Sequence, residues 1–296
     1  MTDQQRKWVY LIILAILWGS SFILIKKGLE GLSALQVGTV RVVIGGTVLV
    51  IIGFKKLKNI RKSSWKWLAL SGFIGTFFPS ILFAYAETEI DSAIASILNS
   101  TVPLLALIIG VVFYKSKFKK AQFIGTVIGL IGCILLILVG ANINSNQNYW
   151  FAILPVIASL MYAFNANIIK TYLQQESALG IAAGSFLILI LPAVVVLFVT
   201  GFFDYTYLSR PEAQSSLIYL AALAIFGTVI AKILFNRLIQ ISNPVFSTSV
   251  TYLIPIVALF WGVLDGESFS FWQLLTGAFI LVGVYISNLN KRKTVK

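Results

Sequence analysis

Phe73-Ile74-Gly75-Thr76 recurs in this chain as Ile225-Phe226-Gly227-Thr228, a displacement of 152 residues. Pro103 and Pro255 match at the same displacement. We count five apolar spans in each copy, and because five is odd, the second copy must cross a bilayer in the opposite sense to the first. The sequence therefore predicts one integrated membrane domain of two inverted repeats, residues 1–144 and 145–296, with a site at the midplane where they meet.

The composition indicates a polytopic membrane protein. Hydrophobic residues make up 58% of the chain, charged residues make up 11%, and the mean hydropathy is +0.92, values that differ from those of soluble domains. The apolar runs are long enough to cross about 30 Å of hydrocarbon, and they are not the short alternating segments of a membrane barrel. We predict an all-α fold of ten transmembrane helices, over residues 8–28, 34–54, 66–87, 92–113, 120–140, 149–170, 179–201, 215–238, 245–264 and 271–289.

The net charge of +13 gathers on one side of this predicted threading. The start and end of the chain and its second and fourth connections hold most of the Lys and Arg residues, whereas the opposite connections hold most of the carboxylates. Because cytoplasmic connections are rich in Lys and Arg, both termini are predicted to be cytoplasmic, with the protein in the cytoplasmic (inner) membrane. We expect these cations to contact membrane lipid and not nucleic acid.

The sequence shows no catalytic or metal-binding pattern. It has no His, and its one Cys, Cys133, lies within the predicted fifth span, where it is interpreted as a small packing residue. We see no cluster of nucleophile, acid or metal ligands, so we expect no enzyme activity, no metal and no cofactor. Gly125 and Gly129 in the same span are typical of close helix packing, within a monomer or at a homodimer face.

Trp18-Gly19-Ser20-Ser21-Phe22 in the first span, followed by Lys26, resembles the opening motif of the EamA family in the drug/metabolite transporter superfamily. Arg41 matches the family's characteristic arginine, and the stretches around Pro103 and Pro255 resemble its fourth and ninth spans. The resemblance covers essentially the whole chain. It implies a ten-helix inner-membrane carrier of metabolites with a central cavity and alternating access, and it does not give the substrate.

Two cations are predicted inside spans. Arg41 lies about 10 Å along the second helix, where a charge needs a partner or water, and we interpret it as a gating or structural residue that can pair with Glu87. Lys232 in the eighth span has Ser80 as its repeat counterpart, so its charge is specific to one repeat. It either reaches the cytoplasmic headgroups or faces the cavity, where it would attract a substrate carboxylate or phosphate.

Polar and aromatic side chains at mid-depth come from spans of both repeats. They either form interhelical hydrogen bonds or line a small-molecule cavity. Pro103 and Pro255 interrupt matched helices and are read as paired hinges. We expect the cavity among the first, third, fourth, sixth, eighth and ninth spans, framed by the other four. The predicted substrate-binding residues are Trp18, Ser20, Ser21, Asn99, Ser100, Tyr162, Asn165, Lys232 and Tyr252.

The sequence favours a secondary transporter that exports a small neutral, zwitterionic or anionic metabolite, such as an amino acid. A multidrug exporter of organic cations is one alternative. However, proton-coupled export of cations needs a carboxylate inside the membrane, and every carboxylate here is predicted outside a span or at its end. A flippase for a lipid-linked substrate is the other alternative, which a lateral opening to lipid would indicate.

Overall fold

The computed structural model of the protein describes residues 3–115, 120–121, 123–125, 127–129, 131–132, 135, 148–267 and 270–288, and this part of the chain is helical without a strand. The elements, with η marking 3-10 or π turns, are α1 (Asp3–Leu29), α2 (Ala34–Leu57), η1 (Lys62–Ser64), α3 (Trp65–Gly72), η2 (Phe73–Phe77), α4 (Phe78–Ala86), α5 (Ser92–Asn99), α6 (Val102–Tyr114), η3 (Tyr149–Ala152), α8 (Ile153–Tyr172), α9 (Ala178–Val199), α10 (Tyr205–Leu208), α11 (Pro211–Ala222), η4 (Leu223–Ile230), α12 (Ala231–Ile241), α13 (Pro244–Thr248), η5 (Ser249–Tyr252), α14 (Ile254–Leu264) and α15 (Phe271–Asn288).

Eight continuous helical runs within the described residues are long and apolar enough to cross a membrane. They coincide with eight of the predicted spans. The predicted fifth span, 120–140, lies largely outside the described residues, and the predicted tenth corresponds to α15. The eight runs are Gln4–Leu29, Ala34–Leu57, Lys62–Ala86, Ser92–Tyr114, Trp150–Tyr172, Ala178–Val199, Pro211–Ile241 and Pro244–Leu264.

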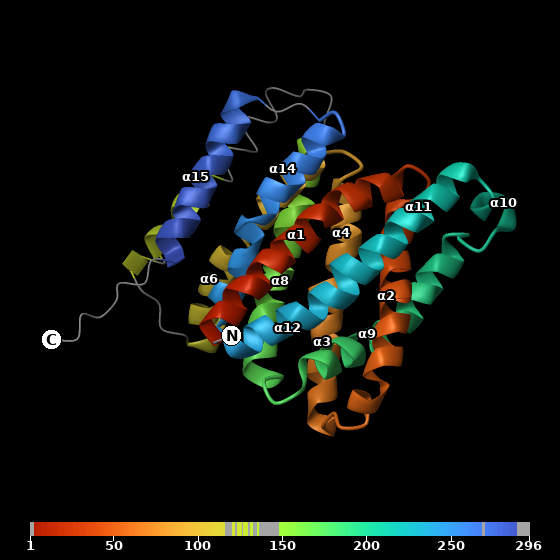
Figure 1. Cartoon of the computed structure of the whole chain (residues 1–296), viewed down its shortest axis with the longest axis horizontal. Helices are drawn as coiled ribbons and strands as arrows, with labels where there is room; N and C mark the ends of the chain where they lie inside the picture. The colour runs from red at the N-terminus through yellow and green to blue at the C-terminus, as the bar shows by residue number, and fades with distance from the viewer. Residues whose placement is uncertain are drawn as a thin grey trace.

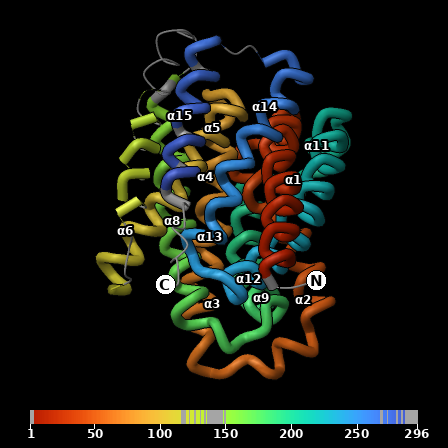
Figure 2. The backbone as a smooth tube through the Cα atoms, turned by 60° about the vertical axis from the view of Figure 1, so that its left-hand side comes forward, coloured from red at the N-terminus to blue at the C-terminus, as the bar shows by residue number. Residues whose placement is uncertain are grey.

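The first helix of each half of the chain packs into the other half. α1 contacts α11, α12 and α14, whereas α8 contacts α3, α4 and α6 (Figure 1). α2 and α9 pack along each other, and they also come from different halves. The α2–α3 and α8–α9 connections lie at the same end of the molecule (Figure 2). The two halves therefore interdigitate, and their shared surface runs through the middle of the bundle.

The two helices predicted to hinge at proline are both interrupted. The run Ser92–Tyr114 is interrupted by a turn at Ser100 and Thr101 between α5 and α6, and the run Pro244–Leu264 passes through the 3-10 turn η5. Proline has no N–H, so Pro255 leaves the carbonyl of Thr251 without its helical donor. Ser100 Oγ donates to that carbonyl at 2.8 Å. The break in one helix is thus satisfied by a side chain from the equivalent break in the other.

The repeated Gly-Thr motif forms π-helical turns in both halves. η2 contains Gly75 and η4 contains Gly227, and each turn sits inside a longer α-helical run. A π turn widens the helix locally and redirects its carbonyls, and such turns are frequent at functional sites. A Cβ added to Gly75 would lie 2.3 Å from Asn165 Nδ2, and one added to Gly227 would lie 2.4 Å from Ser21 Oγ. Both glycines therefore allow a polar side chain of the other half to approach the backbone.

The glycines of the predicted fifth span contact α15. A Cβ added to Gly283 would lie 2.5 Å from the backbone N of Gly129 and 2.7 Å from the carbonyl O of Gly125. Backbone atoms cannot move aside as a flexible side chain can, so α15 needs glycine at position 283. The helices pack closely here, as the pattern of Gly125 and Gly129 predicted, although a Cβ added to Gly129 itself would meet nothing within 4 Å.

Gly283→Ala is expected to lower the free energy of unfolding by about 1–3 kcal/mol, the usual cost of overpacking a filled contact. Thermal unfolding of the purified protein in detergent measures this. Gly277→Ala on the same helix is the matched control, because its added Cβ would meet only Ile97 Cδ1 at 3.9 Å. Equal melting temperatures for the two variants would show that the Gly283 contact is not tight.

Candidate functional site

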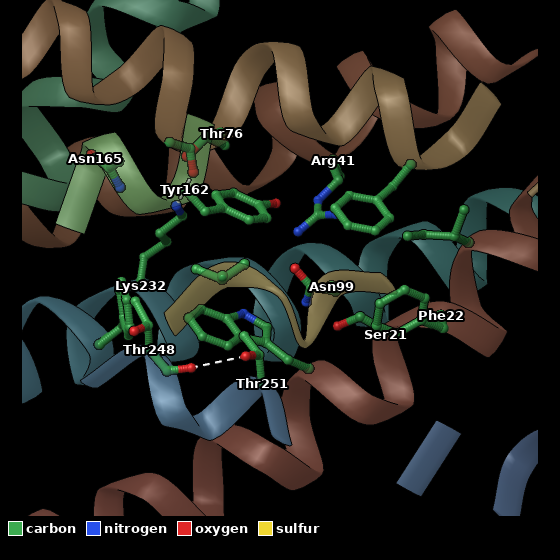
Figure 3. Close-up of a pocket in the computed structure, with 16 residues that line it drawn as sticks. Ser21, Phe22, Arg41, Thr76, Asn99, Tyr162, Asn165, Lys232, Thr248 and Thr251 are labelled. Carbon is green, nitrogen blue, oxygen red and sulfur yellow. Dashed lines mark hydrogen bonds between the residues drawn. The ribbon is translucent and has the colours of Figure 1, made fainter. Parts of the chain in front are cut away.

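A central cavity lies between the two halves, with about 70 Å³ open to the centres of water-sized molecules. This is room for roughly five waters or part of a small solute. The cavity is bounded by aromatic and aliphatic side chains, with a few polar groups and two cations among them (Figure 3). The lining residues are Trp18, Ser21, Phe22, Ile25, Arg41, Gly75, Thr76, Phe83, Asn99, Val102, Tyr162, Asn165, Lys232, Phe235, Thr248 and Thr251.

The two π turns present their glycine carbonyls to cavity residues. Trp18 Nε1 donates to the carbonyl of Gly227 at 3.0 Å, and Lys232 Nζ donates to the carbonyl of Gly75. Each bond joins one half of the chain to the π turn of the other half. The turns therefore fix the indole and the ammonium at the cavity wall, where their orientation depends on how the halves meet.

Lys232 lines the cavity. Its Nζ lies 5.8 Å from the ring centroid of Tyr162, within range of a cation–π interaction. Figure 3 shows the side chain rising beside Tyr162 toward the η2 turn. Of the two positions considered from the sequence, this is the one that faces the cavity.

Arg41 also lies on the cavity wall, although α2 was expected only to frame the cavity. Its Nε donates to Thr228 Oγ1 of η4 at 3.2 Å, and the hydroxyl of Tyr162 points toward its guanidinium (Figure 3). The side chain is buried. Only one of its donors has a protein acceptor among the described residues, so the others can serve a ligand or water.

The cavity lining therefore contains two basic side chains, Arg41 and Lys232, and no acidic one. The ion pairs of the described residues involve Lys26, Lys27 and Arg61, and neither Arg41 nor Lys232 is among them. An unpaired cation in a low-dielectric site attracts an anion strongly. The electrostatics of the wall thus favour a solute that brings negative charge.

Asn99 supplies the cavity's unsatisfied polar group. Its Oδ1 is buried without a hydrogen-bond partner, and Figure 3 shows its amide in the space between Arg41 and Ser21. Asn165 differs, because its Oδ1 accepts from Ser71 Oγ at 2.6 Å. A buried amide oxygen without a donor costs free energy unless a ligand or water supplies one. Asn99 can therefore accept a hydrogen bond from a solute.

Comparison with known proteins decides the family. The sequence model of the EamA-like transporter family matches residues 6–138 and again residues 149–289. The chain belongs to the EamA-like transporter family. The two matches together span almost all of the sequence, and each covers one of the two predicted repeats. With its eight apolar runs, this member of the family is a multi-pass membrane protein.

Several relatives in this family are named as transporters. The uncharacterized inner membrane transporter YedA of Escherichia coli is 30% identical, with 95% of this chain and 90% of that protein covered. A probable terminal-alkyne amino-acid exporter of Streptantibioticus cattleyicolor is 24% identical, with 94% and 92% covered. The S-adenosylmethionine/S-adenosylhomocysteine transporter of Chlamydia trachomatis is 24% identical, with 93% and 87% covered. These names point to transport and not to enzyme activity.

The fold also matches a known crystal structure. That chain superimposes with a TM-score of 0.70 at 14% sequence identity, and 97% of each chain is covered. At this identity the match shows the fold alone. It covers the whole helical arrangement and not just one repeat.

The structure brings most of the predicted site residues of this EamA-like protein to the cavity. Trp18, Ser21, Asn99, Tyr162, Asn165 and Lys232 line it. Three predicted residues do not. Ser20 accepts a hydrogen bond from Trp261 Nε1 at 2.9 Å, Ser100 bonds the Thr251 carbonyl, and Tyr252 is buried in η5 outside the lining set.

Gly75 and Thr76 are lining residues that the sequence reasoning did not propose. The available signal was the repeated motif itself, because a Gly-Thr pair kept in both halves inside apolar helices marks a special backbone. Phe83 and Phe235, which match each other between the repeats, also line the cavity. Positions that carry the same residue type in both repeats therefore indicate the cavity as well as the fold.

Directly after the cavity-lining Ile25 on α1 comes a cluster of charged residues. It is here named the Lys26 network and consists of Lys26, Lys27, Glu30, Asp265 and Glu267. Lys26 Nζ lies 2.8 Å from both Asp265 Oδ2 and Glu267 Oε1, and Lys27 Nζ lies 2.8 Å from Asp265 Oδ1. Burial alone would raise the pKa of the Asp265 carboxyl, but hydrogen bonds from Lys26 and Lys27 lower it below its ordinary value. The network ties the end of α1 to the segment that follows α14.

Proposed function

We propose that the protein is a secondary transporter that exports a small metabolite carrying a carboxylate, an amino acid or a related solute, across the cytoplasmic membrane. The observation that carries this proposal is the pair of cations, Arg41 and Lys232, on the wall of an aromatic cavity without a lining carboxylate. The carboxylate of the solute would lie near Lys232. An ammonium or hydroxyl group of the solute would donate a hydrogen bond to Asn99 Oδ1. The amino-acid exporter among the relatives is consistent with this substrate class.

The organisation that goes with this function is an inverted five-plus-five repeat. We propose ten transmembrane helices, two repeats over residues 1–144 and 145–296, and both termini in the cytoplasm. The double family match and the paired π turns support the repeat, and the one-sided Lys and Arg residues support the orientation. The sequence favours a protein that works as a monomer or homodimer among membrane lipids.

Alternating access would use matched closures at the two ends of the cavity. Trp18 to Lys26 and Tyr162 to Lys170 follow the same pattern, an aromatic residue with a lysine eight positions later. At one end, Lys26 forms ion pairs with Asp265 and Glu267. At the other, Lys170 Nζ donates to three carbonyls at the end of α12, those of Ile239, Gln240 and Ser242. Breaking one closure while the other holds would expose the cavity to one side at a time.

The alternatives from the sequence fit the cavity less well. An exporter of organic cations would place a positive solute beside Arg41 and Lys232, and like charges in a low-dielectric site repel. A lipid-linked substrate would need a lateral opening to the bilayer. The polar lining at mid-depth favours a small solute instead.

A thermal-shift screen of the purified protein tests the proposal. A ligand that binds the folded state raises the melting temperature, by an amount that grows with the logarithm of its concentration relative to its dissociation constant. We expect amino acids and related carboxylates to stabilise the protein, followed by saturable uptake of the best of them into proteoliposomes. Stabilisation by organic cations alone would reject the proposal.

A further inference from the structure

Glu87 is a buried carboxyl group that no step of the proposed transport uses. It follows directly after α4, and 9% of its surface is exposed. Ser92 Oγ donates to its Oε2 at 3.0 Å, while Oε1 is buried without a partner. An ionised carboxylate with a single neutral donor is poorly compensated for the water it has lost, and protonation removes that cost.

Glu267 is a second carboxyl of the same kind, contributed by the other half of the chain. Its side chain is 3% exposed, and its Oε1 accepts a hydrogen bond from the Lys26 ammonium at 2.8 Å. Its Oε2 is buried without a partner. Each carboxyl therefore has one satisfied oxygen and one buried oxygen that lacks a donor.

Charged groups from three other segments act on the Glu87 carboxyl electrostatically. They are Glu267 from the segment after α14, Lys26 from α1 and Arg41 from α2. From α8, the Tyr162 hydroxyl points toward Arg41 (Figure 3). A buried carboxylate beside a like charge is relieved when it takes up a proton. On Glu87, Oε1 has no donor and is where an O–H bond can form.

We propose that Glu87 is a proton-binding group that operates the closure at this end of the cavity. A proton from water binds its free Oε1, and the same proton returns to water on release. The bound proton reduces the negative charge around the Lys26 ammonium. It therefore weakens the electrostatic attraction between the end of α1 and the segment after α14. The proton site stands without the proposed function, whereas its role in opening the cavity rests on it.

Infrared spectroscopy of the purified protein tests proton binding directly and needs no solute. We expect the pH-difference spectrum between about pH 6 and about pH 8, above the range of an exposed Glu, to contain a carboxylic-acid C=O band. The band should be lost in Glu87→Gln and kept in Glu89→Gln, the exposed neighbouring control. A spectrum without the band, or a band that survives in Glu87→Gln, would overturn the proposal.

Thiol labelling tests the effect on the closure. Ile25→Cys, on the cavity wall near Lys26, would be made in a Cys133→Ala background and treated with a water-soluble maleimide. We expect labelling to be several-fold faster at the acidic end of this range, corrected for the reagent's own pH dependence with an exposed cysteine. Glu87→Gln should remove the acceleration. Labelling that is independent of pH while the infrared band titrates would reject the gating role and leave transport by the cavity untouched.

Discussion

Replacing Lys232 with Met is expected to weaken binding of a carboxylate-bearing solute by about 1–3 kcal/mol, or roughly 5- to 150-fold, while the protein stays folded. The ammonium faces the cavity, and its one hydrogen bond from the described residues goes to the Gly75 carbonyl. Met keeps the length and the apolar stem, so the variant removes mainly the charge. The measurement is the solute concentration that gives half-maximal thermal stabilisation or uptake.

Two variants make this result specific. Lys232→Arg keeps the charge and should retain much of the affinity, and Lys62→Met removes a charge that is exposed away from the cavity. The eighth span carries a charge where its repeat counterpart, Ser80, has none, which suits a symmetric scaffold that binds an asymmetric solute. Unchanged affinity with intact transport in Lys232→Met would mean that this cation does not contact the solute.

Replacing Lys26 with Met is expected to lower the free energy of unfolding by about 2 kcal/mol. Removal of one partner of a buried pair leaves the other without compensation, and we reduce the usual cost because Lys26 is itself partly exposed. Glu267, whose side chain is 3% exposed, loses its one ion pair in the described structure. Thermal unfolding of the purified protein provides the measurement.

A double variant separates this effect from loss of the lysine's packing. Lys26→Met combined with Glu267→Gln removes both charges and should recover part of the lost stability. Lys27→Met is the matched control, and its effect should be smaller because Glu30, one of its two partners, is 54% exposed. A double variant less stable than Lys26→Met would show that the Lys26–Glu267 pair is not what stabilises this end.

The sequence predicted the helices well because each has its own local signal. Runs of apolar residues of membrane length mark eight helical spans, and Pro103 and Pro255 mark the two interruptions, since proline removes a backbone donor wherever it lies. The repeated Gly-Thr motif predicted the pairing of the halves. It could not predict the π turns, because their i to i+5 hydrogen bonds depend on what packs beside them.

The site was predicted in part, because depth along a helix does not fix the direction of a side chain. Tyr252 lies at the expected depth, but it belongs to the 3-10 turn η5, where the spacing of 3.6 residues per turn no longer holds. Ser20 and Ser21 are neighbours, yet they face Trp261 and the cavity respectively. Arg41 was placed near a gate, and it lies on the cavity wall because Thr228 of the other half accepts its Nε.

The proposed binding of a solute carboxylate in the cavity is tested most directly by matched ligands that differ mainly in charge. Each amino acid or small carboxylate would be compared with its own carboxamide for thermal stabilisation of the purified protein, with Lys232→Met beside the wild type. We expect at least one carboxylate to stabilise the wild type and its carboxamide not to, and we expect Lys232→Met to respond equally to the two ligands. Equal stabilisation by carboxylate and carboxamide, or stabilisation by organic cations alone, would contradict it.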